Sequence, residues 1–395
     1  MISRLEKAGR RRGMWNRTRF GVFLGLLSLA ATVTVFSFSQ TVVENPAKPT
    51  AKNAGRVVTP EEVLAISDEG TSDYYFVVPR NLSIAPDGSL FLLDKSQVLQ
   101  FDKNGKFVRN IYKKGQGPGE MDYVTACLTT DKNVIVHSYP PHKLLFFDYS
   151  GKYEKEIPVR AAGWYKMKTL LFEGGTFYIQ TAESPRVKGD PDYVEVPQTI
   201  VALSGATNEI RKLSSFSDRA FVVTSSSGRQ TGLFEISTFI AVPFKGKYLA
   251  LTHTSEYMLK IYDPAGDKVV REFRRTYERV KPEPLTEEQK KGGLIIDGKH
   301  YGPPGQKYQN DIKNLFTRGD EIWAVTSTKD KSKGVLIDVF DGEGVYRDCF
   351  YLKLPEAALQ YVLYPGYCVL DGDFLWVVER SEDETVAIKK YRVVI

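Results

Sequence analysis

Cysteine, methionine and histidine are scarce in this sequence of 395 residues, which contains three Cys, five Met and four His. A secreted domain that depends on disulfide bonds needs a denser, even-numbered set of cysteines. We therefore expect Cys127, Cys349 and Cys368 to be free, buried thiols, with a Cys349–Cys368 bond as the alternative. The motifs HExxH, GxSxG and CxxC do not occur. The signatures of zinc proteases, serine hydrolases and dithiol redox enzymes are therefore missing.

An excess of charge of one sign is also missing from most of the chain, although the formal net charge is +6. Seven of the 54 basic residues and one of the 48 acidic residues lie within residues 1–39, which leaves 47 of each sign in residues 40–395. A nucleic-acid-binding domain normally carries a basic patch or stripe. The balanced charge therefore predicts that nucleic acid is not a partner.

A long uncharged run occupies residues 20–38, directly after the basic segment. A basic segment followed by an apolar run is typical of a secretory signal peptide, and small residues before Gln40 provide a cleavage site. The run also has the length of a transmembrane helix, about 17–25 residues, so an uncleaved signal anchor is the alternative. Residues 1–39 are thus predicted to be a leader helix and residues 40–55 a polar linker. We expect the remainder to be periplasmic or extracellular, tethered to the inner membrane only if the leader is retained.

Aromatic residues, glycine and proline are plentiful, with 22 Tyr, 22 Phe, 32 Gly and 20 Pro. Aromatic side chains favour strands, and glycine and proline favour turns. One pattern recurs: an aromatic residue, Asp, two variable residues and Gly. Its copies begin at Phe101, Phe147, Tyr262 and Phe340. Each lies between two strand-like apolar runs, so a capping Asp and a glycine with positive φ predict a hairpin turn.

A second pair of strand-like runs precedes each copy, which gives units of four short strands. The first two copies are 46 residues apart, the period of a propeller blade. Six units can be counted, and the last one ends at its third strand. Because an open edge invites aggregation, we expect residues 56–66 to supply the missing outer strand. The sequence thus predicts an all-β fold over residues 56–395: a six-bladed β-propeller of four-stranded blades, closed by an N-terminal strand that joins the last blade.

The first unit resembles an NHL repeat. Residues 85–94 and 98–108 follow that family's pattern of Asp-Gly, a strand ending in Asp, and V-x-x-F-D-x-x-G-K-F. Residues 115–121 resemble its G-x-G-P-G-E-F link between blades, with Met121 in place of the usual aromatic residue. The chain is therefore similar to exported bacterial six-bladed propellers of the NHL-repeat-like or TolB-like kind. This resemblance implies the fold and export, and it leaves the function open.

The long insertions all fall on one predicted face of the propeller. The turns between first and second and between third and fourth strands are short and share one face. The insertions at residues 181–197, 214–234 and 274–307 use the other connections, which share the opposite face; we call it the loop-rich face. Loops on a rigid scaffold commonly carry function, and drift of surface loops is the alternative. The candidate ligand-binding residues on this face are Arg80, His137, Tyr139, His142, Tyr193, His253, Arg279, Tyr301 and Asp311.

These observations predict an extracytoplasmic binding or scaffold module that recognises a protein, peptide or glycan through the loop-rich face. We expect a monomer without catalytic residues or cofactor. The alternative is a lactonase-like, metal-dependent hydrolase or lyase with its site at the mouth of the central channel, which needs converging His, Asp, Glu or Asn side chains. His137, His142 and His253 could share such a site, or could be separate loop histidines. Arg80 and Asp311 could equally form structural salt bridges.

Overall fold

The computed structural model of the protein describes residues 42–159, 164–188, 190–285 and 291–395. These residues belong to a unit that spans Gln40–Ile395. The predicted leader lies outside the described residues. The short α-helix α2 covers Glu356–Val362, and within the part of the chain that is described no helix is long and apolar enough to cross a membrane.

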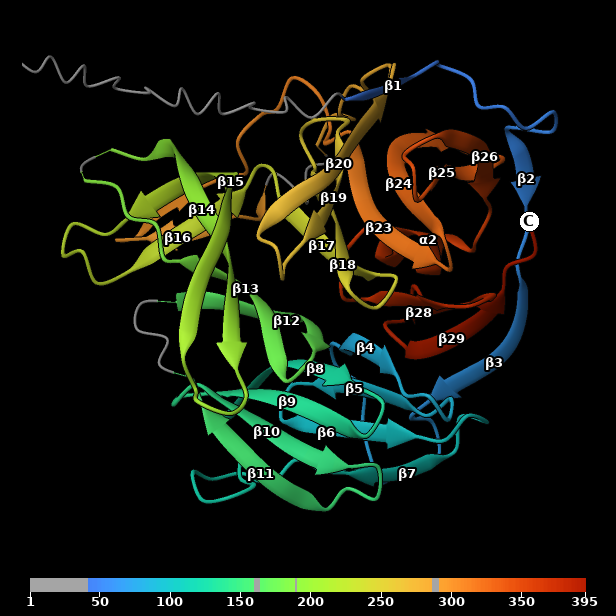
Figure 1. The fold of residues 1–395 in the computed structure, drawn as a ribbon. Helices are drawn as coiled ribbons and strands as arrows, with labels where there is room; N and C mark the ends of the chain where they lie inside the picture. The colour runs from blue at the N-terminus through green and yellow to red at the C-terminus, as the bar shows by residue number, and fades with distance from the viewer. Residues whose placement is uncertain (1–41, 160–163, 189, 286–290) are drawn as a thin grey trace, which may run out of the picture. The chain divides into compact units, whose positions relative to one another are not determined.

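Six sheets form the blades of a propeller, which we number in chain order (Figure 1). Blades 1 to 3 contain β4 (Arg80–Ile84), β5 (Leu90–Asp94), β6 (Gln97–Phe101) and β7 (Phe107–Asn110); β8 (Tyr123–Thr129), β9 (Asn133–Tyr139), β10 (Lys143–Asp148) and β11 (Tyr153–Pro158); and β12 (Trp164–Glu173), β13 (Thr176–Glu183), β14 (Asp192–Ser204), β15 (Ile210–Thr224) and β16 (Thr231–Glu235). Blades 4 to 6 contain β17 (Phe239–Phe244), β18 (Tyr248–His253), β19 (Leu259–Asp263) and β20 (Lys268–Arg275); β23 (Ile312–Arg318), β24 (Glu321–Asp330), β25 (Gly334–Asp341) and β26 (Tyr346–Leu352); and β27 (Cys368–Asp371), β28 (Phe374–Arg380) and β29 (Val386–Arg392).

The first strand of each blade lies innermost. The inner strands β4, β8, β12, β17, β23 and β27 are neighbours in that order, and β27 lies beside β4, so the ring is closed. The predicted six-bladed β-propeller is therefore confirmed. Blades pack on one another through buried aliphatic and aromatic side chains, which form a separate cluster at each junction.

The last blade is closed by β3 (Glu61–Ser67), which pairs antiparallel with β29 in the register Ile66↔Ile388. Ile66 is 3% exposed and packs in the cluster between blades 6 and 1. An N-terminal strand thus completes the sheet that the C-terminal strands leave open, as predicted. This pairing removes the edge that β29 would otherwise present.

The chain before β3 follows a path that the sequence did not indicate. The segment expected to form one strand over residues 56–66 contains two, and the first, β2 (Arg56–Val58), adds to blade 5 parallel to β26. Further upstream, β1 (Val43–Asn45) adds to blade 4 parallel to β20. Residues predicted as a linker therefore contribute a strand. The side chain of Asn45 joins blades 4 and 5, because it donates to the carbonyl of Gly344 over 2.8 Å and accepts from the N–H of Tyr346 over 2.8 Å.

The recurring turns have the predicted chemistry. In the copies that begin at Phe101, Phe147 and Phe340, the Asp side chain accepts hydrogen bonds from the N–H groups two and four residues later. The glycine of each copy has φ of 78° to 80°. In the copy that begins at Tyr262, the positive φ moves one residue on, to Asp267. All four turns lie on the face opposite the insertions.

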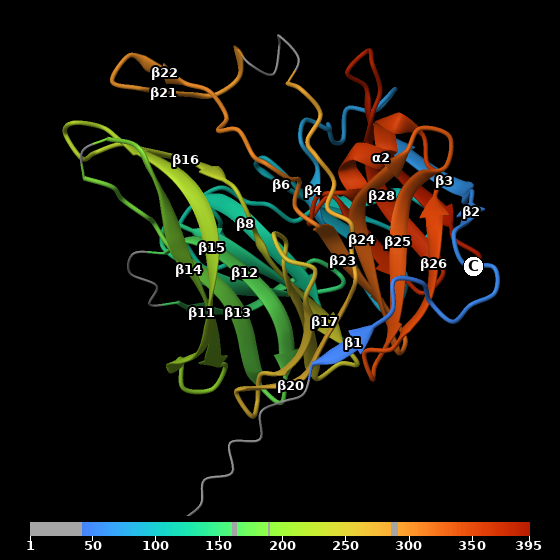
Figure 2. The ribbon, with the colours of Figure 1, turned by 90° about the horizontal axis from the view of Figure 1, so that it is seen from above.

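Two of the insertions extend a blade instead of forming irregular loops. Residues 192–204 and 210–224 are the long strands β14 and β15, and β16 pairs with β15. Alternate apolar residues of this extension bury a small core of their own, because a strand places every second side chain on the same side. The third insertion carries the hairpin of β21 (Leu294–Ile296) and β22 (Lys299–Tyr301) (Figure 2). Asp297 of this hairpin accepts a hydrogen bond of 2.6 Å from the N–H of Ser226, next to β16.

A buried ion pair joins blades 4 and 5. Asp338 of β25 is fully buried and accepts from Nε and Nη2 of Arg275 over 2.8 and 2.6 Å. The hydroxyls of Tyr257 and Tyr346 also donate to this carboxylate. The guanidinium of Arg275 is 4.8 to 5.2 Å from the ring centres of Tyr257, Tyr277 and Tyr346. Every charge in this cluster is thus paired, as burial requires.

Candidate functional site

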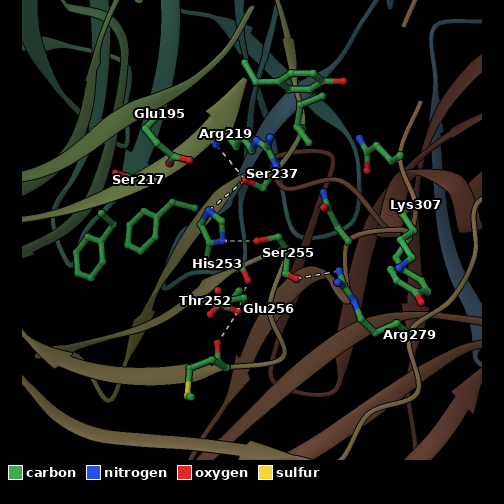
Figure 3. Close-up of a pocket in the computed structure, with 18 of the residues that line it drawn as sticks. Glu195, Ser217, Arg219, Ser237, Thr252, His253, Ser255, Glu256, Arg279 and Lys307 are labelled. Atoms are coloured by element: carbon green, nitrogen blue, oxygen red, sulfur yellow. Dashed lines mark hydrogen bonds between the residues drawn. The ribbon is translucent and has the colours of Figure 1, made fainter. Parts of the chain in front are cut away.

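A cavity of about 1100 Å³ opens on the loop-rich face between blades 3 and 4 (Figure 3). One wall is the extension of blade 3, made by β14 and β15. The second wall is the end of β18 and the loop that follows it, and the third is formed by residues 279, 305–308 and 310 of the long insertion after β20. Its volume slightly exceeds the roughly 300–1,000 Å³ of pockets that hold a drug-sized ligand.

The blade 3 wall is the face of a sheet. Tyr193 and Glu195 of β14 and Ser217 and Arg219 of β15 line the cavity, two residues apart on each strand. Glu195 is paired directly with Arg219 across the two strands. The guanidinium of Arg219 lies 4.8 Å from the ring centre of Tyr193. Carboxylate, guanidinium and aromatic ring thus lie side by side on one surface.

His253 occupies the second wall, between two hydroxyl groups (Figure 3). Its Nε2 is 3.1 Å from Oγ of Ser237, and its Nδ1 is 2.7 Å from Oγ of Ser255. Ser237 is itself held, because its Oγ accepts from the N–H of Arg219 over 3.0 Å. Burial lowers the pKa of His253 below its usual value of 6.5. The imidazole is therefore neutral at pH 7 and can both donate and accept a hydrogen bond.

Arg279 connects the second and third walls. Its Nε donates to Asp311 over 2.9 Å and its Nη2 to the carbonyl of Ser255 over 3.0 Å. The guanidinium lies 4.8 Å from the ring centre of Tyr308. Asp311 is 4% exposed, and burial raises its pKa although Arg279 opposes the shift. The buried carboxylate thus fixes the position of the guanidinium beside the cavity.

Formal charges at the cavity are balanced. The cationic side chains on its walls are Arg219, Lys260, Arg279 and Lys307. Glu195 and Glu256 also line it, and Glu272 and Asp311 form ion pairs of 2.9 Å with Lys260 and Arg279. The cavity therefore offers both donors and acceptors without a net field of either sign.

The structure brings four of the predicted residues to this place: Tyr193, His253 and Arg279 line the cavity, and Asp311 holds Arg279. The other cavity residues that matter were missed, chiefly Glu195, Arg219, Ser237, Ser255 and Tyr308. A signal existed for Glu195 and Arg219, because each is a charged residue directly before an apolar one, Val196 or Ala220, in a strand-like run. No pattern in the sequence indicates that these strands lie beside the loop after β18.

A second group of predicted residues meets in blade 2. His137 is not a loop residue, as its sequence context suggested, but a buried residue of β9. Its Nε2 is 3.0 Å from Nδ1 of His142, and its Nδ1 is hydrogen-bonded to the hydroxyl of Thr125. The ring of Tyr139 lies 4.3 Å from that of His142. Burial, with His142 next to it, lowers the pKa of His137 to about 3.

Two candidates, Arg80 and Tyr301, lie apart from both groups, and the histidines do not share one site. His253 belongs to blade 4, so the three histidines expected to share a site are divided between two blades. Arg80 is exposed at the start of β4, and Tyr301 is on β22, with the ammonium of Lys299 5.0 Å from its ring centre. Within the described ranges, no three His, Cys, Asp or Glu side chains are placed to hold a metal ion.

Comparison with known proteins supports the same architecture. A family model described as a 6-bladed β-propeller matches residues 66–180. A protein of Bacteroides fragilis that carries the description "exported protein" has a similar structure, with a TM-score of 0.51, 13% sequence identity and coverage of 90% of this chain and 100% of that one. The predicted resemblance to six-bladed β-propeller proteins is thus confirmed.

Two other structures are more distant. A gluconolactonase of Xanthomonas campestris has a TM-score of 0.42 and 10% identity, over 86% of this chain and 98% of that one. The calcium-binding protein regucalcin of Agrobacterium tumefaciens has a TM-score of 0.39 and 11% identity, over 89% and 97%. No curated protein matches the chain in sequence. At these identities the similarity concerns the fold alone.

Proposed function

We propose that this protein is an extracytoplasmic binding module whose ligand, a segment of protein, a peptide or a glycan, occupies the cavity between blades 3 and 4. The observation that carries the proposal is the convergence of Tyr193, His253 and Arg279 on one cavity of the loop-rich face. The basic, then apolar, N-terminal sequence supports export of the propeller.

The site is suited to binding because its polar groups are held in place before a ligand arrives. Ser237 and Ser255 fix the two nitrogens of His253, and Asp311 fixes Arg279. A preorganised group loses little conformational freedom when it binds. Aromatic rings beside these polar groups supply apolar contact area.

Screening the purified protein against arrays of peptides and of oligosaccharides tests the proposal. We expect one of these classes to bind, and His253→Ala and Glu195→Gln each to weaken that binding about tenfold. His300→Ala is the matched control, because His300 is an exposed histidine of β22 that does not line the cavity. Binding that both cavity variants leave unchanged, or no binding by either array, would refute the proposal.

The metal-dependent alternative is tested by elemental analysis of the same protein. One equivalent of calcium or zinc that survives dialysis, and is lost when residues at the channel mouth are replaced, would favour a hydrolase or lyase over a binding module. We expect substoichiometric amounts of both metals.

A further inference from the structure

Exposed aromatic side chains gather on the loop-rich face. Among the side chains that are described, every exposed Tyr, Phe or Trp is a tyrosine at a strand end or a connection of this face: Tyr75, Tyr123, Tyr139, Tyr193 and Tyr364. Among the described residues, no Tyr, Phe or Trp side chain is exposed on the opposite face, where the turns are short. Large aromatic groups are normally buried, so five on one face mark it as a contact surface.

Two of these tyrosines form a platform on blade 2. Tyr123 of β8 and Tyr139 of β9 are paired directly across the two strands, so their side chains leave the same side of the sheet about 4.5–5.5 Å apart at Cβ. They are 66% and 44% exposed. The imidazole of His142 packs on Tyr139 and is hydrogen-bonded to the buried His137. We call Tyr123, Tyr139 and His142 the blade 2 platform.

The platform and the cavity share the chemistry that sugars require. A pyranose ring has an apolar face of C–H groups, which packs on an aromatic ring, and hydroxyls that each donate and accept a hydrogen bond. Tyr193 and Tyr308 supply rings beside the cavity. Glu195 and Glu256 can accept from hydroxyls, and Arg219 and Lys307 can donate to them. The balanced charges suit a ligand that is itself neutral.

Other polymers fit this surface less well. Nucleic acid binds through an excess of Lys and Arg, whose charge is here matched by carboxylates. An extended peptide commonly adds to an open sheet edge, but the blade 3 wall presents the face of β14 and β15. An amphipathic helix needs an apolar groove, whereas charged groups line all three walls of this cavity.

We infer that the ligand is a neutral polysaccharide, with some sugar residues in the cavity and others stacked on the blade 2 platform. Blade 2 is the neighbour of blade 3, whose extension forms the cavity wall, so one chain can reach both along a single face. This inference rests on the proposed function and specifies its ligand. It predicts that a polymer binds more tightly than a short oligosaccharide that fills only the cavity.

The test uses electrophoresis of the purified protein through gels that contain laminarin, dextran, xylan or soluble starch, with polygalacturonate as the anionic comparison. The tetrasaccharide of whichever polymer retards the protein is then titrated calorimetrically. Tyr193→Ala should weaken the binding of both the tetrasaccharide and the polymer about tenfold, because one stacking surface is lost. The double variant Tyr123→Ala/Tyr139→Ala should weaken binding of the polymer about tenfold and leave the affinity for the tetrasaccharide unchanged.

Two controls separate stacking from structural damage. The variant Tyr123→Phe/Tyr139→Phe keeps both rings and should retain most of the polymer affinity. Val108→Ala replaces an exposed side chain on the outer strand β7 and should change nothing.

Three results would overturn the inference. These are retardation by polygalacturonate alone, unchanged polymer affinity in the double alanine variant, and failure of all the polysaccharides to bind. If the polysaccharides fail while a peptide binds and His253→Ala weakens that binding, the proposed function stands and this inference falls. If neither class binds, both fall.

Discussion

Acid should destabilise this protein through His137, and His137→Gln should remove that part of its sensitivity. The folded protein holds the imidazole 2% exposed, and burial lowers its pKa from 6.5 to about 3. In the unfolded chain the same group takes up a proton near pH 6.5. Between these two pH values the unfolded state binds one more proton than the folded state. The free energy of unfolding therefore falls as the pH falls, by about 1.36 kcal/mol for each pH unit.

The expected size of this effect follows from the pH interval. From pH 7.5 to 4.5 the His137 contribution to the free energy of unfolding should drop by about 2.7 kcal/mol, and above pH 7.5 it should be constant. Urea unfolding at pH 7.5, 6.5, 5.5 and 4.5 measures it for the wild type and for His137→Gln. Subtracting the two profiles cancels the titration of distant groups, and His300→Gln, at an exposed histidine, is the control. Parallel profiles for wild type and His137→Gln would refute the reasoning.

Three further predictions concern the framework. Asp338→Asn should lower the free energy of unfolding by about 3–5 kcal/mol in urea titrations, because it leaves Arg275 buried without its counterion. The double variant Arg275→Met/Asp338→Leu should lose less stability, and equal losses in the two variants would contradict this account. Ile66→Ala in the closing strand should cost about 2–5 kcal/mol in the same assay, whereas Val63→Ala, at an exposed position of that strand, should stay within about 0.5 kcal/mol. Ellman's reagent should reach none of the three thiols before unfolding, since all are buried and burial raises the pKa of two of them to about 12; a thiol that reacts in the native protein would show a local opening.

Much of the framework could be predicted because it is encoded locally. The turn that begins at Phe101 needs only a capping Asp and Gly105 with positive φ, and both lie within five residues. Repetition of this turn set the period, and the unit that ended one strand short pointed to an N-terminal strand. The three thiols were also expected to be free and buried, as they are.

The site could be predicted only in part. The lengths of the insertions indicated the face, and Tyr193, His253 and Arg279 were chosen because they lie in or beside the connections of that face. The residues that surround them come from segments more than fifty positions apart, such as Glu195 of β14 and Ser255 of the loop after β18. The histidine trio was divided because His253 lies in blade 4, whereas His137 of blade 2 turns inward, where Thr125 and His142 satisfy its two nitrogens.

The sequence by itself determined the repeat, the turn chemistry, the number of blades and the side on which the insertions lie, because each depends on residues close together in the chain. The tertiary structure decided that β1 and β2 attach to blades 4 and 5, that two insertions extend a sheet, and that a cavity with balanced charge forms between blades 3 and 4. These features depend on which surfaces meet when the ring closes. The free energy of such contacts comes from burial and pairing between distant segments, which no local pattern records.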